Sequence, residues 1–82
     1  MRVYYVSFRS VTFGQQAERL LRNSGYQCSL RRSPRWMEEQ GCGYALRLRA
    51  EEIEPVTQLL RDRQIPMRRA YVQSADGKMV EV

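Results

Sequence analysis

The stretch that decides the fold is residues 3–30, with the sequence VYYVSFRSVTFGQQAERLLRNSGYQCSL. Residues 3–8 are mostly apolar, β-branched or aromatic, which predicts a strand. The next apolar side chains recur with the spacing of one helix face: Phe13, Ala17, Leu20 and Leu21. This spacing predicts a helix over residues 12–24, which Gly25 would end. Residues 26–30 alternate between apolar and polar side chains, which predicts a second strand.

The rest of the chain continues this succession of strands and helices. Three further elements are expected: a strand over residues 44–49, a helix over residues 53–60 and a strand over residues 67–73. Asp76 and Gly77 then predict a tight turn that folds the last residues back as a C-terminal hairpin. The order β-α-β-β-α-β predicts one α+β domain over residues 1–82, a small ferredoxin-like sandwich with two helices on one face of an antiparallel sheet.

The composition excludes several kinds of functional site. The 82 residues include two cysteines and no histidine, so the chain cannot form a Ser-His-Asp triad, a Cys-His dyad, or a histidine-ligated or four-cysteine zinc site. We expect no metal and no cofactor. The chain lacks the roughly 20 consecutive apolar residues of a membrane span, and its N-terminus lacks a signal-peptide pattern. A cytoplasmic location, no membrane contact and reduced thiols are therefore expected.

Positive charge is concentrated in the first part of the chain. The net charge is +5, and 13 of the 14 basic residues are arginine. Residues 1–35 hold seven arginines and one acid, Glu18, for a net charge of +6, whereas residues 36–82 sum to −1. This charge is either a solvated surface or complementary to an acidic or anionic partner, to which arginine gives bidentate contacts.

The tripeptide Gly41-Cys42-Gly43 is the most informative chemical motif. A nucleophilic thiol has to be exposed and partly ionised, and glycines on both sides leave room around the sulfur and let the backbone turn. The motif belongs to a connection expected over residues 31–43. Three arginines of this connection would favour the thiolate and two acids would oppose it: Arg31, Arg32 and Arg35 against Glu38 and Glu39. The residues alone leave open both a reactive Cys42 and a buried, inert one.

Two other features near this motif have alternative interpretations. Cys28 shares its strand face with apolar residues, which favours packing in the core. Alternatively, Cys28 is a resolving thiol for Cys42, which requires their Cα atoms to lie within roughly 7 Å of each other. Pro34, Arg35 and Trp36 form either a turn with a packing tryptophan or a binding segment, in which Arg35 contacts an anion and Trp36 anchors a partner.

Several short motifs resemble those of the selenium/sulfur (Se/S) carrier protein-like family, formerly a domain of unknown function. The family motifs are a strand ending in phenylalanine, a helix with Ala-Glu-x-Leu-Leu, a Pro-Arg pair, and a Cys-Gly that opens a strand with an Ala-Leu pair. In this chain they fall on Phe8, residues 17–21, Pro34-Arg35, Cys42-Gly43 and Ala45-Leu46. The resemblance covers residues 4–49. The chain departs from it at Glu39-Gln40-Gly41, where members often have small hydroxyl residues.

This resemblance implies a carrier protein rather than a stand-alone enzyme. Cys42 would receive a persulfide or perselenide from a cysteine desulfurase or a selenium-donor protein and pass it to an acceptor protein, in a step similar to thiol–disulfide exchange. Arg35 would stabilise the bound anion, with Pro34, Gly41 and Gly43 as the other binding residues. The basic first half would help docking to acidic partner surfaces.

Two alternatives come from other classes of protein. The sheet face opposite the helices would present tyrosines and arginines: Tyr5, Arg47, Arg49, Arg69 and Tyr71. Such a face suits a basic ferredoxin-like RNA-binding module, because rings stack on bases and arginines neutralise phosphate. Against this, residues 44–48 lack the aromatic-rich motif of those domains. The other alternative is a protein-interaction module without chemistry, which binds a protein through the sheet face or edge.

Overall fold

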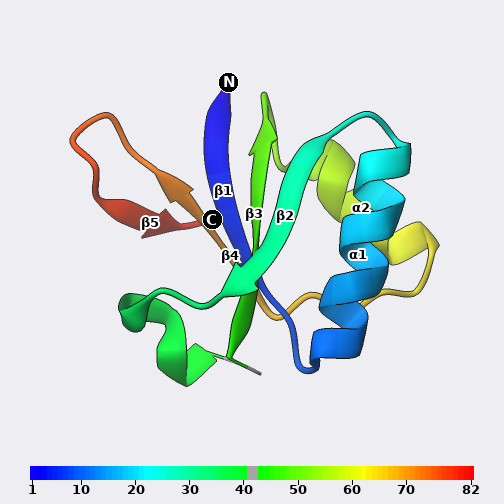
Figure 1. Ribbon diagram of the computed structural model, residues 1–82. Coiled ribbons are helices and arrows are strands. Elements are labelled where there is room, and N and C mark those ends of the chain that lie inside the picture. The colour runs from blue at the N-terminus through cyan, green and yellow to red at the C-terminus, as the bar shows by residue number, and fades with distance from the viewer. Residues whose placement is uncertain (41–42) are drawn as a thin grey trace.

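Five strands form the sheet: Arg2–Ser7 (β1), Gln27–Arg32 (β2), Tyr44–Ala50 (β3), Arg69–Gln73 (β4) and Met79–Glu81 (β5). The computed structural model describes residues 1–40 and 43–82. The strands lie in the order β2-β3-β1-β4-β5, and all their pairings are antiparallel (Figure 1). Two helices, Val11–Asn23 (α1) and Glu54–Asp62 (α2), follow β1 and β3 and lie together on one face of the sheet (Figure 1). The predicted ferredoxin-like arrangement is therefore confirmed.

Local signals determine where the helices begin and end. Ser10 caps α1, because its Oγ accepts a hydrogen bond from the Phe13 N–H at 3.3 Å. Gly25 lies just beyond the end of α1 with a φ of +96°, a conformation that side-chain-bearing residues rarely adopt. Pro55 lies in the first turn of α2, where its missing N–H removes no helical hydrogen bond. In the described part of the chain, no helix combines the length and the apolar character needed to span a membrane.

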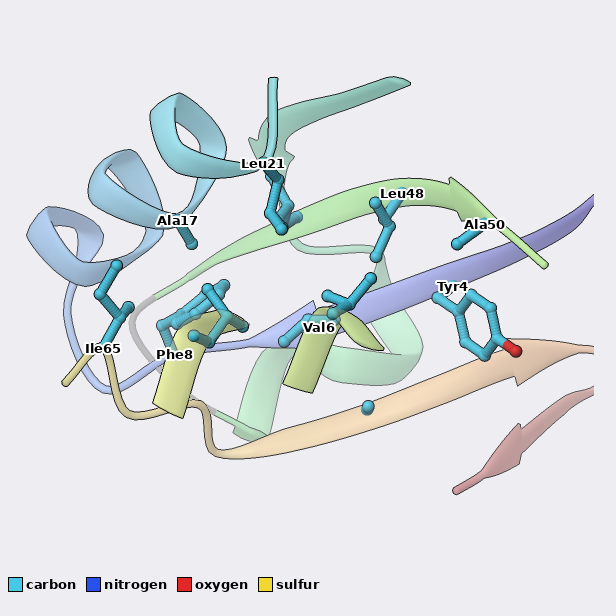
Figure 2. Packing of buried hydrophobic residues seen from close by; sticks show 12 residues of the cluster. Tyr4, Val6, Phe8, Ala17, Leu21, Leu48, Ala50 and Ile65 are labelled. Carbon is cyan, nitrogen blue, oxygen red and sulfur yellow. The ribbon is translucent and has the colours of Figure 1, made fainter. Parts of the chain in front are cut away.

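The core lies between the helices and the sheet face that they cover (Figure 2). Alternation along each strand directs every second side chain toward the helices, and each helix contributes one apolar stripe. The largest side chains of this cluster are at most 1% exposed: Tyr4, Val6, Phe8, Leu21, Leu46, Leu48, Val56 and Leu60. Figure 2 shows Phe8 toward one end of the cluster and Tyr4 toward the other.

The predicted C-terminal hairpin is present and widens the sheet by one strand. β5 pairs with β4, with Val80 opposite Val72. The turn that joins them contains Gly77 at a φ of +86°. The Asp76 carboxylate accepts hydrogen bonds from the Ser74 hydroxyl and, at 3.1 Å, from the Lys78 N–H. Both bonds lower the pKa of Asp76, and the bond from Ser74 has the larger effect.

Three details differ from the prediction. The strand β2 continues to Arg32, so Arg31 and Arg32 belong to the strand and not to the connection, because both pair with residues of β3. The connection after β2 contains a short 3-10 helix, Arg35–Gln40 (η1). Its six residues are too few for a helical apolar period, and Ser33, as a residue before proline, favours extended backbone. In addition, β4 begins at Arg69 rather than at Met67. The reason is that Arg69 already pairs with Ser7, the last residue of β1, so the strand has no partner for Met67.

Candidate functional site

The candidate site lies at one end of β2 and β3, where the connection of residues 33–43 begins and ends. The register of the two strands pairs Arg32 with Tyr44. One step further, the Ser33 N–H donates a hydrogen bond to the Gly43 carbonyl oxygen at 2.8 Å. This bond continues the pairing beyond the strands and closes the connection into a loop. The two ends of the loop are therefore adjacent.

This loop brings together three of the predicted site residues. Pro34 and Arg35 follow its first residue, and Gly43 is its last, with a φ of +88° that favours glycine. Arg35 is exposed and forms no ion pair with any carboxylate that the structure describes. Gly41 and Cys42 lie outside the described residues. The roles of all five residues in binding or transfer stay predictions.

The 3-10 helix of the loop packs against the sheet face opposite α1 and α2. The Trp36 ring meets Tyr5 and Tyr71 edge-on, with centroid distances of 5.7 and 5.0 Å. The next residue, Met37, is 1% exposed, and its N–H donates a hydrogen bond to the Pro34 carbonyl oxygen at 2.8 Å. The packing interpretation of Trp36 is confirmed. Because Trp36 keeps 45% of its surface exposed, its role as a partner anchor stays a prediction.

Cys28 lies on β2 opposite Leu48, with its sulfur toward α1. The Sγ–H donates a weak hydrogen bond to the Glu18 carbonyl oxygen at 3.7 Å, and the half-buried side chain packs against the core. Burial raises the pKa of the Cys28 thiol, which the nearby Arg22 guanidinium offsets only in part. The expected packing role is confirmed. The resolving role involves Cys42, which is not described, and stays a prediction.

Glu18 has a structural role that sequence reasoning missed. Its Oε2 accepts a hydrogen bond from the Leu30 N–H at 2.7 Å and lies 3.6 Å from Arg22 Nη2. Arg22 Nε in turn donates a hydrogen bond to the Cys28 carbonyl oxygen at 3.0 Å. Two α1 side chains thus bind backbone groups of β2, which is an edge strand. The sequence did contain a signal for this role: Glu18 is the only acid in residues 1–35, and it precedes Arg22 by one helical turn.

We expect Cys28 to be a slow nucleophile near neutral pH, because a raised pKa keeps its thiolate fraction low. In a Cys42→Ser variant, the rate of alkylation by iodoacetamide, followed by intact mass from about pH 7 to about pH 10, should stay below that of an unstructured cysteine peptide. The rate should still be rising at pH values where the peptide has levelled off. The same variant unfolded in urea serves as the control. Equal rates for the folded variant and the peptide at every pH would contradict the assignment.

Two of the surface hollows outside the loop lie at the end of α2 and over the sheet. One, of about 480 Å³, is next to the end of α2 and is lined by Thr57, Leu60, Arg61, Gln64, Ile65, Pro66 and Met67. The other, of about 240 Å³, lies over β2 and β3 and is lined by Gln27, Cys28, Ser29, Arg47 and Arg49. Among the side chains that the structure describes, no three metal-ligating groups come together.

The family model described as "Putative Se/S carrier protein-like" matches residues 3–72. This range runs from β1 into β4 and includes both helices and the whole loop. No curated protein and no solved structure matches the chain. Because the family model covers well over half of the 82 residues, the resemblance is confirmed, and this chain belongs to the Se/S carrier protein-like family.

Proposed function

We propose that this protein carries sulfur or selenium as a persulfide or perselenide on Cys42. The observation that carries the proposal is the family match over residues 3–72, which includes both the Pro34-Arg35 pair and Cys42-Gly43. The loop closure supports it, because the Ser33–Gly43 hydrogen bond places the residue before the Pro34-Arg35 pair next to the glycine of Cys42-Gly43.

The proposed transfer consists of two exchange steps without net oxidation or reduction. The Cys42 thiolate attacks the terminal sulfur of a persulfide on a donor protein. A new S–S bond forms on Cys42, the donor's S–S bond breaks, and the donor cysteine leaves as a thiolate. An acceptor thiolate then attacks the terminal sulfur on Cys42, which leaves as a thiolate in its turn. Selenium would move in the same way through an S–Se bond.

Arg35 is the residue best suited to stabilise the anion in these steps. Its side chain is exposed at the start of η1, and it has no carboxylate partner among the described residues. A guanidinium group makes charge-assisted hydrogen bonds to an anion. Because the chain has no histidine, Cys42 would depend on such donors, on backbone N–H groups of Gly43 or Gly41, or on a partner for its ionisation.

The partners in this proposal are proteins, and the chain acts as a carrier rather than as a stand-alone enzyme. A cysteine desulfurase or a selenium-donor protein would load Cys42 in the cytoplasm, and an acceptor protein would unload it. No cofactor is required, because the donor supplies the chalcogen already activated. The net charge of +6 on residues 1–35 would favour acidic docking surfaces on both partners.

The test is intact-protein mass spectrometry after incubation with a cysteine desulfurase, cysteine and pyridoxal phosphate. The wild-type chain should gain about 32 Da, one sulfur atom, and should lose it again on addition of a thiol. Cys42→Ser should gain nothing, whereas the matched variant Cys28→Ser should load like the wild type. With a selenium donor, the expected gain is about 79 Da.

A second comparison tests Arg35. Arg35→Gln should slow loading about tenfold or more, because a hydrogen bond to a charged group contributes about 1.5–3 kcal/mol. Arg63→Gln, an exposed arginine beyond α2, is the matched control and should load normally. An adduct on Cys28 alone, or no adduct in any of these reactions, would overturn the proposal. Equal rates for the two arginine variants would remove Arg35 from it.

A further inference from the structure

The sheet face opposite the helices carries a row of polar and aromatic side chains that crosses all five strands. The register places Arg47 between Ser29 and Tyr5, and Tyr71 on the other side of Tyr5, followed by Glu81. Strand alternation puts these residues on the face that the core does not use. We refer to this surface as the open face.

Two guanidinium groups of the open face have no counter-charge among the side chains that the structure describes. Of the strand residues that the structure describes, only Glu81 is acidic, and it pairs with Arg69 at 3.3 Å. Arg47 and Arg49, two residues apart on β3, form no ion pair with any described carboxylate. Together with Gln27 and Ser29 of β2 and with Cys28, they line the hollow of about 240 Å³. A polar hollow between two unpaired arginines is suited to an anion.

An exposed aromatic surface lies beside this hollow. Trp36 is held over the open face by its edge-on contacts with Tyr5 and Tyr71, yet 45% of its surface is exposed. Tyr5 is also the register neighbour of Arg47, so the ring cluster and the unpaired charges are next to each other. The tyrosines themselves are only partly exposed, which leaves the Trp36 indole as the main ring surface for a ligand.

We propose that the open face binds single-stranded nucleic acid, with phosphate groups on Arg47 and Arg49 and a base stacked on Trp36. Single-stranded binding sites combine a positive groove along the backbone with aromatic rings that accept any base. Each nucleotide supplies both a phosphate and a base, so the combination of unpaired arginines and an exposed indole favours a nucleic acid. This site is independent of Cys42 and of the proposed carrier function.

Binding can be measured with two probes, labelled oligo(U) and oligo(dT) of about 12 nucleotides, by fluorescence anisotropy at about 50–200 mM NaCl. Trp36 is the only tryptophan of the chain, so quenching of its emission reports stacking directly. For the wild type we expect binding to at least one probe, with quenching. Preference between the two probes distinguishes RNA from DNA.

The double variant Arg47→Gln/Arg49→Gln should weaken binding about tenfold or more and should reduce the slope of log Kd against log salt by about 1.4, or about 0.7 per phosphate contact. The matched control Arg61→Gln/Arg63→Gln removes the same charge from exposed positions in and after α2 and should change the affinity less than threefold. Circular dichroism checks that both variants fold.

Four results would overturn the proposal. They are no binding to either probe at about 50 mM NaCl, binding without Trp36 quenching, equal weakening in the two double variants, and displacement by polyglutamate as effective as by unlabelled oligonucleotide. The last result would identify the open face as a site for acidic protein segments. If Cys42 fails to gain a persulfide, the carrier function is overturned but the proposal for the open face is not, because the two proposals involve different residues.

Discussion

Replacing Phe8 by alanine is expected to lower the free energy of unfolding by about 4 kcal/mol. Phe8 is 0% exposed and lies in the cluster between the sheet and the helices. Truncation would remove the burial of the ring and leave a cavity that the neighbours fill only in part. A chain of 82 residues typically has about 4–12 kcal/mol of stability in total, so this variant would lose about a third of it or more. The phenylalanine of the family motif is thus predicted to be structural.

Urea denaturation followed by circular dichroism measures this change. Val82→Ala is the control, because Val82 is 57% exposed and its truncation should cost less than about 0.5 kcal/mol. A loss of less than about 1 kcal/mol for Phe8→Ala would show that the core tolerates the cavity, contrary to the packing described.

Replacing Met37 by alanine should lower the free energy of unfolding by about 2–3 kcal/mol and loosen the loop. Met37 is 1% exposed but does not belong to the main core cluster. Ser7 and Ala45, a register pair on the open face, are also buried. We infer that η1 covers this end of the open face and that Met37 is the side chain that anchors it.

This variant has a local readout, because the adjacent Trp36 is the only tryptophan. If Met37 anchors the loop, the emission of Trp36 should shift to longer wavelength in Met37→Ala under native conditions. Met1→Ala, at a position that is 82% exposed, should change neither stability nor emission. An unchanged emission maximum together with a stability loss below about 0.5 kcal/mol would show that the loop is held by other contacts.

The order of strands and helices could be predicted because each element carries a local signal. The β-branched and aromatic content of β1, the alternation in β2 and β3 and the apolar stripe of α1 are properties of consecutive residues. The Asp76-Gly77 turn likewise specified the hairpin. What could not be predicted depends on residues far apart in the chain. Trp36 contacts Tyr5 and Tyr71, and nothing near Trp36 in the sequence indicates either partner.

For the candidate site, the identity of the residues could be predicted, but their arrangement in space could not. The motif residues Pro34, Arg35 and Gly43 could be selected from the sequence, but their proximity follows from the β2–β3 register and the Ser33–Gly43 hydrogen bond. Register depends on how whole strands pair, so short motifs do not reveal it. The chemistry assigned to Cys42 rests on the family and stays a prediction.

The contacts of Glu18 and Arg22 with β2 have a consequence for polymerisation. An unpaired strand edge is a template on which another chain can add, and amyloid-like growth begins in this way. A chain approaching β2 would first have to displace the Glu18 carboxylate from the Leu30 N–H and the Arg22 guanidinium from the Cys28 carbonyl. One helix therefore supplies both part of the core and a charged barrier that keeps the sheet from growing at β2.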